Sequence, residues 1–445
     1  MGARAVYPRE VPPPPNIVFI MADDLGYADL SCYGRRDFET PNIDRIAGRG
    51  LRLSQGYANS AVCSATRLAL ITGRYQYRLR LGLEEPLAGN TEVGLPPEHP
   101  TLPSLLRQAG YGTSLIGKWH LGFLPKFGPL KSGYDHFFGF RSGAVDYYSH
   151  RNPRQQHDLW EEDVEIHQVG YVTELLGARA VDTVNGYARA DRSFLISLHF
   201  NAPHWPWEAP GDESEARYVA GTNLRHFDGG TQEIYARMIG AMDREIGRVL
   251  DALDAHGLAQ NTIVIFTSDN GGERFADTWP FTGRKTELLE GGLRVPTLIA
   301  WPARIPSGST SEQVAISMDF MPTLLAAAGA APDPAYPPDG MNLLPALTGG
   351  APVERKLFWR YKTHRQRAAR IGNYKFLKIL DNTFLFEVVE DPLERANLKD
   401  RRRDVYDRLV AEWERWNAAM LPEVPDSFAE SYTGAQIADR YGLLS

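Results

Sequence analysis

Short apolar runs that stop abruptly at polar residues recur along this chain and limit the folds that it can adopt. The runs span residues 16–21, 194–198 and 262–266, and a fourth at 295–299 follows a glycine-rich turn. The polar residues that follow the first three runs are, in order, Asp23 and Asp24, Asn201 and His204, and Asp269 and Asn270. A short continuous apolar run is typical of a parallel strand that is buried on both faces. The pattern therefore predicts a sheet that gathers polar side chains at the carboxyl ends of its strands.

Helical patterns lie between these runs. Thr101 is placed as an N-cap before an apolar segment that stops at Gly110. Residues 234–253 carry apolar side chains at helical spacing, and Gly257 follows them. Because strand and helix alternate, we predict an α/β fold in which a large mixed, mostly parallel sheet is sandwiched by helices. Ligands bind such sheets at the carboxyl ends of the strands, which is where the polar residues of this chain fall.

The chain changes character after residues 332–350, a segment rich in proline and glycine. Short runs that are typical of strands joined by tight turns follow at 356–359, 368–371, 374–379 and 384–388. A closing helix is predicted from the apolar residues on one of its faces, Val405, Leu409, Trp413, Trp416 and Met420. We therefore predict a main domain over residues 1–350 and a smaller α+β domain, with a short antiparallel sheet and a terminal helix, over residues 351–445.

Composition and charge exclude some classes of partner. The chain of 445 residues has 48 Lys and Arg against 55 Asp and Glu, a formal net charge of -7, which argues against nucleic acid and against an anionic membrane surface. Residues 1–15 hold no apolar stretch of signal-peptide length, and no segment is long enough to span a bilayer. The sequence as written predicts a cytoplasmic protein, or a periplasmic or secreted one if a leader was removed. The oligomeric state stays open.

A reactive position is indicated at Cys63, which small residues and Arg67 follow at a predicted helix start. The positive end of a helix dipole and a neighbouring arginine both favour an anion at such a place. The alternative is a small cysteine that only packs at the start of the helix. Cys32 is the one other cysteine of the sequence, and we expect it to be a free thiol.

The run from Cys63 to Arg67, with Thr72-Gly73-Arg74 after it, resembles the signature of the formylglycine-dependent type I sulfatases. Ala65 stands where most members of that family have proline. Further segments that resemble the family are 117–122, 201–206, 285–296, 317–325, 339–343, 369–375 and 385–398, so the resemblance covers nearly the whole chain. It implies an arylsulfatase-like fold of the alkaline phosphatase superfamily and conversion of Cys63 to formylglycine by a formylglycine-generating enzyme. In the family, one oxygen of the hydrated aldehyde attacks sulfur and the other later expels sulfate.

A metal site is indicated by the two pairs of oxygen-bearing residues. Asp23 and Asp24 repel each other unless a cation lies beside them, although a helix cap or a solvated turn would also explain the pair. Asp269 and Asn270 end a second strand, and two glycines after them would let the backbone fold closely around a ligand. Such oxygen ligands suit calcium, with magnesium as the alternative. The resemblance makes these four residues, together with the converted Cys63, the ligands of the metal.

Three more segments resemble parts of the family's site that bind sulfate, although each residue taken alone could be structural. Lys118 and His120 would point to the same side of an extended stretch. The resemblance makes Lys118 a sulfate ligand and His120 the group that accepts a proton from the diol. His204 corresponds to a sulfate-binding histidine that protonates the leaving oxygen. Lys285 corresponds to the lysine that bridges sulfate and leaving oxygen, since its spacing to the next motif favours it over Arg284.

Together these features predict a sulfatase, a sulfuric ester hydrolase that converts an aryl, alkyl or carbohydrate sulfate monoester to the free hydroxyl compound and inorganic sulfate. Arg67, Lys118 and Lys285 would hold the negative charge that builds as the sulfur–oxygen bond breaks. His204 would be the acid and His120 the base.

Two alternatives stay open at this point. The same groups could hold a phosphoryl group, as in a phosphonate monoester or phosphodiester hydrolase of the same superfamily. A non-catalytic protein that binds a sulfated ligand would fit if Cys63 stays a thiol. The sequence fixes neither the sulfated substrate nor an additional sulfate contact expected near Ser142–Asp146. We expect loops 150–165, 207–226 and 359–367 to set the substrate.

Overall fold

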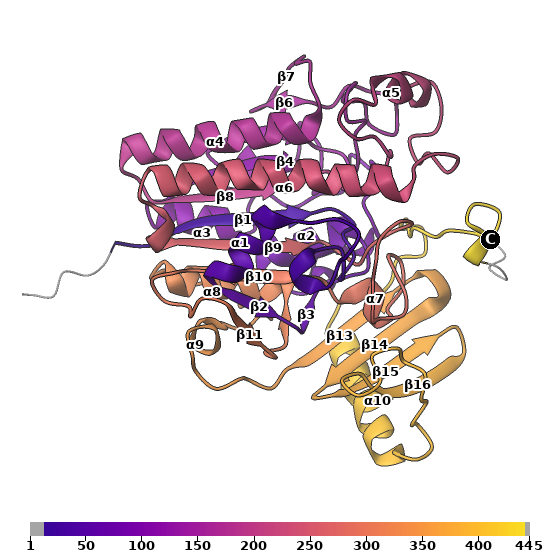
Figure 1. Cartoon of the computed structure of the whole chain (residues 1–445). Coiled ribbons are helices and arrows are strands. Elements are labelled where there is room, and N and C mark those ends of the chain that lie inside the picture. Colours follow the sequence, from indigo (N-terminus) through magenta and orange to yellow (C-terminus); the bar gives the residue numbers. More distant parts are fainter. Residues whose placement is uncertain (1–12, 441–445) are drawn as a thin grey trace, which may run out of the picture.

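The computed structural model describes residues 13–440 and is built around one ten-stranded sheet (Figure 1). Across the sheet, the strands are β11 (Ser309–Ser311), β2 (Leu51–Leu53), β10 (Thr297–Ala300), β9 (Thr262–Ser268), β1 (Asn16–Ala22), β8 (Phe194–His199), β4 (Gly112–Lys118), β5 (His136–Phe140), β6 (Trp160–Glu161) and β7 (Val164–Glu165). The central strands from β9 to β5 run parallel, while β10 and β6 pair antiparallel with their inner neighbours. The predicted mixed, mostly parallel sheet is confirmed.

Helices cover both faces of this sheet. One layer holds α1 (Pro41–Arg49), α4 (Val172–Ala190) and α6 (Gln232–Ala255), and the other holds α2 (Cys63–Thr72), α3 (Leu102–Gln108) and α8 (Phe320–Ala327). Alternate side chains of β1 point to opposite faces of the sheet. Val18 and Ile20 pack against the first layer of helices, and Phe19 and Met21 pack against the second. The apolar run of β1 is continuous because both of its faces are buried.

The N-cap that the sequence indicates at Thr101 is confirmed, and a second helix is capped by Thr231. Thr101 caps α3 by accepting the backbone N–H of Ser104 at 3.2 Å. Thr231 caps α6 in the same way, accepting from Ile234 at 3.1 Å. The predicted strand at 295–299 begins two residues later, at Thr297, because Val295 and Pro296 still belong to the turn that leads into β10.

A second sheet of four antiparallel strands follows, in the order β13 (Lys356–Tyr361), β14 (Gln366–Ile371), β15 (Tyr374–Ile379) and β16 (Asn382–Glu387). Helix α10 (Arg403–Ala418) lies against it, with Val405 and Leu409 buried in the contact. Met420 is buried too, but it lies beyond the helix, which ends at Ala418. The predicted antiparallel subdomain is confirmed, and a boundary at residue 350 stays a prediction.

Short elements connect these layers. The short strands and helices are β3 (Gly56–Tyr57), β12 (Ala315–Ile316), α5 (Glu213–Val219), α7 (Glu290–Leu293) and α9 (Leu344–Leu347). The 3-10 turns are η1 (Ser31–Tyr33), η2 (Gln76–Arg78), η3 (Arg80–Leu83), η4 (Leu130–Ser132), η5 (Ala259–Asn261), η6 (Ser317–Asp319), η7 (Thr363–Arg365) and η8 (Ala438–Arg440).

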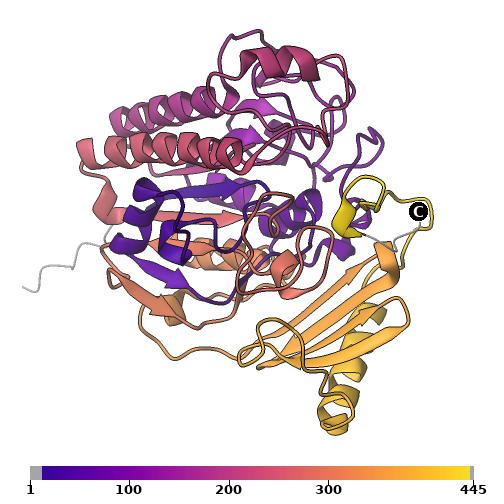
Figure 2. The same cartoon turned by 45° about the vertical axis from the view of Figure 1, so that its right-hand side comes forward.

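The segment after α10 returns to the main domain, as the yellow ribbon in Figure 2 shows. We call residues 421–432 the C-terminal strap. The N–H of Glu85 donates to the carbonyl of Phe428 at 2.9 Å, and the N–H of Glu430 donates back to the carbonyl of Glu85 at 2.6 Å. Lys362, at the end of β13, donates from Nζ to the carbonyls of Val424 and Ser427. These bonds hold the strap beside the carboxyl end of the main sheet.

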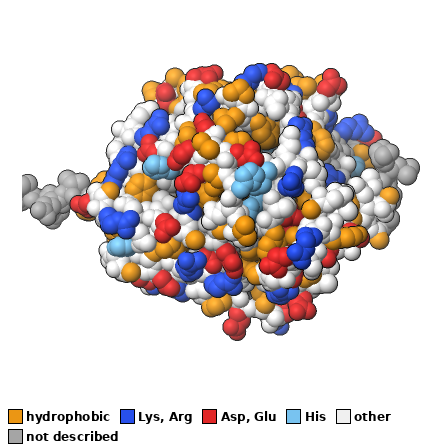
Figure 3. Space-filling view, turned by 90° about the horizontal axis from the view of Figure 1, so that it is seen from above, with side chains coloured by type: hydrophobic (Ala, Val, Ile, Leu, Met, Phe, Trp, Pro, Cys, Tyr) orange, Lys and Arg blue, Asp and Glu red, His pale blue; other side chains and the backbone are white. Residues whose placement is uncertain are grey.

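The surface agrees with the modest net charge. On the face seen in Figure 3, basic and acidic side chains are interspersed rather than gathered into a field of one sign. Among residues 13–440, no helix is both long enough and apolar enough to cross a bilayer. Residues 1–12, on which the predicted lack of a signal peptide mostly rests, lie outside the described part of the chain.

Candidate active site

The polar residues that follow the central strands meet at one end of the sheet, as predicted. Asp23 and Asp24 follow β1, His204 follows β8 and Asp269 follows β9, while Lys118 is the last residue of β4. Carboxylate oxygens of Asp23, Asp24 and Asp269 all lie within 4.8 Å of one another. The carboxyl ends of the parallel strands therefore build the site.

Each of the three carboxylates is paired with a cation. Lys118 Nζ lies 2.6 Å from Asp23 Oδ2, and Lys285 Nζ lies 2.8 Å from Asp24 Oδ2. The third pair joins Arg67 to Asp269, whose Oδ2 accepts from Nε at 3.0 Å and from Nη2 at 2.8 Å. All six side chains are at most 2% exposed. Charges taken this far from water are stable only as such pairs.

Two other oxygens of the same cluster are buried without a hydrogen-bond partner. They are Asp23 Oδ1 and Asn270 Oδ1. Asn270 donates from Nδ2 to Asp24 Oδ1 at 2.7 Å and to the carbonyl of Gly271 at 2.9 Å, which leaves its Oδ1 as the unused acceptor. A buried acceptor without a donor costs about 1 to 3 kcal/mol. Oxygens left over in this way fit a hard cation, so the residues present suit the predicted metal site.

The pKa shifts of the carboxyl groups also favour a cation at this place. Burial, reinforced by Asp269, raises the pKa of Asp23 well above its usual range, although Lys118 opposes the shift. Burial also acts on Asp269, but Arg67 and Lys118 outweigh it and hold the pKa of Asp269 below its usual range. One carboxyl of the cluster is thus held ionised, while the other lacks the positive charge that it needs to ionise readily.

Cys63 is the first residue of α2, as predicted, and it is only 2% exposed. Ligand atoms of Cys63, Asp23 and His204 lie within 4.8 Å of one another. Burial raises the pKa of the unmodified Cys63 to about 12 even though Lys118 and Lys285 act in the opposite direction. At neutral pH the unmodified side chain is a neutral, unreactive thiol.

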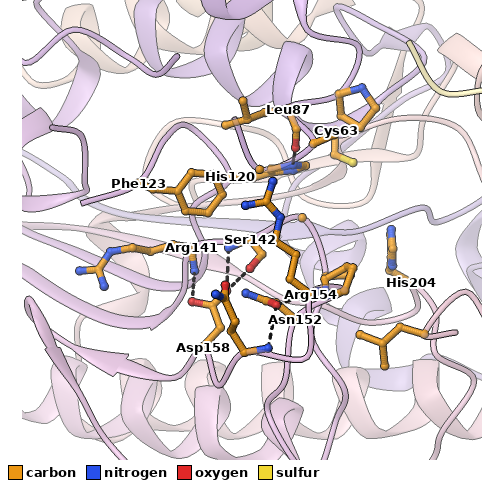
Figure 4. Close-up of a pocket in the computed structure, with 18 of the residues that line it drawn as sticks. Cys63, Leu87, His120, Phe123, Arg141, Ser142, Asn152, Arg154, Asp158 and His204 are labelled. Atoms are coloured by element: carbon orange, nitrogen blue, oxygen red, sulfur yellow. Dashed lines mark hydrogen bonds between the residues drawn. The ribbon is translucent and has the colours of Figure 1, made fainter. Parts of the chain in front are cut away.

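His120 lies beside Cys63 in the cavity, but not for the reason that its spacing suggested. Strand β4 ends at Lys118, and His120 has a left-handed backbone with φ of 58° rather than an extended one. Its Nε2 lies 2.8 Å from the carbonyl of Leu87 (Figure 4). Since a carbonyl only accepts, Nε2 carries the proton, and the unpartnered Nδ1 is left as a buried proton acceptor. Burial, followed by Lys118, holds the pKa of His120 well below its usual value.

His204 is oriented by its neighbour. Its Nδ1 donates to the carbonyl of Trp205 at 2.7 Å, so that Nε2 faces Lys285 Nζ at 3.4 Å and Asp24 Oδ2 at 3.5 Å. Burial, followed by the lysines at 285 and 118, holds the pKa of His204 well below its usual value. The resting side chain is therefore neutral.

The structure separates the two cations at 284 and 285. Arg284 points outward and pairs with Asp439, whereas Lys285 is 1% exposed and lies in the site. Glu290 and Arg294, in the segment that follows Lys285, form an ion pair at 2.7 Å, and both side chains are buried.

A cavity of about 410 Å³ opens over Cys63. Its floor includes His120, His204 and Lys285, and Figure 4 shows part of its wall around Ser142, Asn152 and Asp158. Ser142 lines this wall, but its N–H and hydroxyl donate to Asp158.

Asp146, the other residue expected near an additional sulfate contact, is buried and accepts the N–H groups of Tyr148 and Ser149. Of the loops expected to set the substrate, 150–165 and 207–226 do contribute to the cavity. The loop at 359–367 contributes none of the residues that line this cavity, although its Lys362 and Thr363 border a neighbouring hollow, and Phe428 and Glu430 of the C-terminal strap line the cavity. Loop residues such as Arg154 carry no periodic signal in the sequence, so neither they nor the strap could be found from it.

Comparisons with family models and with curated relatives assign the chain to the same family. Residues 15–330 match the sulfatase family, and residues 283–417 match the C-terminal family of N-sulphoglucosamine sulphohydrolase. The chain is 34% identical to N-acetylgalactosamine-6-sulfatase of Canis lupus familiaris, over 82% of this chain and 72% of that protein. It is 32% identical to arylsulfatase A of Homo sapiens, over 81% of this chain and 74% of that protein.

Solved structures agree. The crystal structure of Ps i-CgsB in complex with k-i-k-neocarrahexaose matches with a TM-score of 0.84 and 29% identity, over 96% of this chain and 97% of that one. Phosphonate monoester hydrolase of Agrobacterium radiobacter shares the fold at a TM-score of 0.62 and 20% identity. The resemblance that the motifs carry is thereby confirmed: the chain belongs to the sulfatase family and is a sulfuric ester hydrolase.

Proposed function

We propose that this sulfatase hydrolyses the sulfate monoester of a carbohydrate and that its nucleophile is formylglycine, made from Cys63 by a formylglycine-generating enzyme. The observation that carries the proposal is the cavity itself, in which Cys63, His120, His204 and Lys285 share one floor. A neutral thiol with a pKa near 12 would be a poor nucleophile there. Once the thiol is converted to an aldehyde and the aldehyde is hydrated, a hydroxyl oxygen of residue 63 can attack sulfur.

A calcium ion is the metal that we propose, held by Asp23, Asp24, Asp269 and Asn270 together with the converted residue 63. The unpartnered Asp23 Oδ1 and Asn270 Oδ1 support a hard cation that takes oxygen ligands, and calcium accepts about six to eight of them in flexible geometry. When bound, the cation supplies positive charge that stabilises the negative charge on the reacting groups.

Three cations of the chain would bind the sulfate and the charge that develops on it. Lys118, Lys285 and Arg67 each neutralise one carboxylate in the structure, as described above. A divalent cation on those carboxylates would release part of the lysines' hydrogen-bonding capacity for sulfate oxygens. Preorganised donors in a buried site stabilise a developing charge far better than donors in water do.

The two histidines would move the protons. His120 Nδ1 is fixed as an acceptor by the bond from Nε2 to Leu87, so it can take a proton from a hydroxyl group on residue 63. His204 is neutral at rest, and the negative charge of a bound sulfate next to it would raise its pKa. Once protonated, its Nε2 can donate to the leaving oxygen.

A carbohydrate is the alcohol that the cavity and the relatives favour. The relatives named above include an N-acetylgalactosamine-6-sulfatase and a structure with a bound neocarrahexaose. Aromatic Trp205 and Phe428 and the amides of Asn152 and Asn223 line the cavity. Aromatic faces and amide groups are the partners that sugar rings and hydroxyls require.

The experiment that tests this proposal has two steps. A peptide mass spectrum of the segment with Cys63 should show the loss of about 18 Da that marks conversion of the thiol to the aldehyde. The converted protein should then release inorganic sulfate from N-acetylgalactosamine 6-sulfate and 4-nitrophenyl sulfate faster than it hydrolyses a phenylphosphonate monoester. An intact thiol in fully active protein, or faster phosphonate hydrolysis, would refute it.

A further inference from the structure

A second hollow adjoins the active-site cavity, and residues of three chain segments line both. This hollow of about 700 Å³ is bordered by Asn90, Lys362 and Thr363, and by the carboxylates of Asp426 and of Glu84, which is paired with Arg80 at 2.8 Å. Ala88, Arg154 and Phe428 line both the hollow and the cavity over Cys63. The two spaces are therefore neighbouring compartments that share a border, and a ligand longer than one sugar unit can extend from the first into the second.

Arg154 differs from the other cations that line the cavity. Arg141 pairs with Asp163 at 2.9 Å, Arg225 with Glu430 at 3.4 Å, and Lys285 with Asp24 as described. Arg154 is exposed, and within residues 13–440 its guanidinium has neither an ion pair nor a hydrogen bond. An arginine held at a ligand cavity without a carboxylate partner is available for an anion from outside the protein.

The guanidinium is nevertheless positioned. The backbone N–H of Arg154 donates to Asn152 Oδ1 at 2.9 Å, which fixes the turn from which the side chain starts (Figure 4). Its far end rests against Gly89: a Cβ added there would lie 2.8 Å from the guanidinium carbon. Gly89 also has a φ of +77°, which other residues rarely adopt. This glycine thus provides the flat surface on which the guanidinium rests.

The third shared residue offers an apolar face. Phe428 is 38% exposed, yet its backbone is held on both sides, by Glu84 Oε2 at 2.9 Å from its N–H and by the N–H of Glu85 at 2.9 Å from its carbonyl. An exposed ring on an anchored backbone is suited to pack against the face of a sugar ring. Lys362, in the same hollow, is occupied by carbonyls of the C-terminal strap and is not free for a ligand.

We infer that the adjoining hollow binds the sugar unit next to the sulfated one, and that Arg154 recognises an anionic substituent, a carboxylate or a second sulfate, on that unit. The inference rests on the proposed carbohydrate sulfatase function. Phe428 packs against the same unit irrespective of its charge, so the site selects oligosaccharides by length through Phe428 and by charge through Arg154.

The test compares matched substrates with the converted, metal-loaded enzyme. The substrates are a sulfated monosaccharide, a disaccharide with the same sulfated end and a uronic acid as its second unit, the methyl ester of that disaccharide, and a disaccharide with a second sulfate in place of the carboxylate. The wild type should favour the anionic disaccharides over the methyl ester. In Arg154→Gln the ratio of kcat/KM for anionic over esterified disaccharide should fall by about 10-fold to 50-fold, mainly through KM, and Arg154→Lys should restore part of it.

Controls separate the possible failures. Arg189→Gln, an exposed arginine on α4, removes the same charge elsewhere and should leave the ratio as in the wild type. Phe428→Ala should lower kcat/KM for all disaccharides alike relative to the monosaccharide. An equal loss on every substrate in Arg154→Gln, or a wild type that prefers the ester, would overturn the inference while the sulfatase proposal stands. No hydrolysis of any sulfate by converted enzyme would overturn the sulfatase proposal instead. Whichever anionic disaccharide loses more in Arg154→Gln identifies the substituent.

Discussion

Lys375 Nζ lies 2.9 Å from Glu290 Oε1 and joins the C-terminal sheet to the segment that carries Lys285. Lys375 is on β15, Glu290 begins α7, and Lys285 precedes Glu290 by five residues. Glu394 Oε1 also lies 2.9 Å from the same ammonium group. These three side chains are at most 1% exposed, so one buried ammonium serves two buried carboxyl groups. The site therefore depends on the C-terminal sheet for the position of one of its elements.

Replacing Lys375 by Met should destabilise the protein by about 3 to 5 kcal/mol, because the carboxyl of Glu394 would stay buried without its cation and Glu290 would lose one of the two cations with which it is paired. Lys375 lowers the pKa of both carboxyls against the effect of burial, so its loss raises both. Protonated carboxyls need no cation, and the deficit should be smaller at pH 5 than at pH 8. Urea unfolding at both pH values measures it. Lys356→Met, at an exposed pair with Glu412, should cost below about 1 kcal/mol and serves as the control; equal losses in both variants would refute the prediction.

Glu208→Gln should be tolerated at pH 6 and should become more stable than the wild type as the pH rises. Burial, followed by Asp146, raises the pKa of Glu208 to about 9, and its Oε2 accepts the N–H of Tyr147 at 3.1 Å. From the unfolded value of 4.5 up to about 9 the native state holds a proton that the unfolded state releases, so wild-type stability falls with rising pH. Glutamine has no such proton, and the difference should grow by up to about 1.4 kcal/mol per pH unit. Parallel stability curves between pH 6 and 9 would contradict this.

Cys63→Ala should abolish sulfate release while leaving the fold intact. Cys63 is the first residue of α2, where alanine fits the helix and removes one small side chain, for a cost of about 1 kcal/mol. Turnover of 4-nitrophenyl sulfate measures the loss of activity, and thermal unfolding followed by circular dichroism shows whether the fold is intact. Activity comparable to the wild type would rule out residue 63 as the nucleophile.

Removal of the metal should lower both activity and stability. Without a metal ion, the carboxylates of Asp23, Asp24 and Asp269 stay buried close to one another, and Asp23 Oδ1 has no hydrogen-bond partner. Calcium at 100 times its dissociation constant should stabilise the chelated protein by about 2.7 kcal/mol. Differential scanning calorimetry with chelator, calcium or magnesium measures the shift, and Asp23→Asn should weaken the response to calcium. A melting temperature that changes with neither chelator nor calcium would argue against the metal site.

His204→Ala should slow the hydrolysis of a sugar sulfate far more than that of 4-nitrophenyl sulfate. The sugar alkoxide is a poor leaving group and needs the proton from Nε2, worth about 100-fold to 10,000-fold in rate, whereas nitrophenolate leaves readily without it. Steady-state kinetics on both substrates give the comparison. The same loss on both would assign His204 to sulfate binding rather than to proton transfer.

The strands and their polar ends could be predicted because burial on both faces forces a continuous apolar run, and because a polar residue must follow where the strand leaves the core. The placement of Asp23 and Asp269 follows from that rule. The backbone of His120 could not be predicted, since a left-handed φ of 58° leaves no trace in spacing. Nor could the ion pair of Lys375 with Glu290, which joins residues 85 positions apart.

The residues of the cavity wall could not be predicted from the sequence for a related reason. Residues such as Arg154, Asn223 and Phe428 come from loops and from the C-terminal strap, where neither helical nor strand periodicity applies. Their convergence depends on tertiary contacts, such as the bonds of Glu85 with Phe428 and Glu430, rather than on local pattern. The residues at the floor of the cavity could therefore be predicted, while most of those in its wall could not.

The depth of Cys63 has a consequence for the biosynthesis of the protein. In the folded chain this residue is 2% exposed under a cavity that the strap, more than 350 positions later in the sequence, helps to enclose. A modifying enzyme that must grip the backbone around residue 63 has to meet it before the fold closes, while the last residues are still to be made or still to dock. The order of events during synthesis, rather than the affinity of two finished proteins, would then decide what fraction of the molecules is ever active.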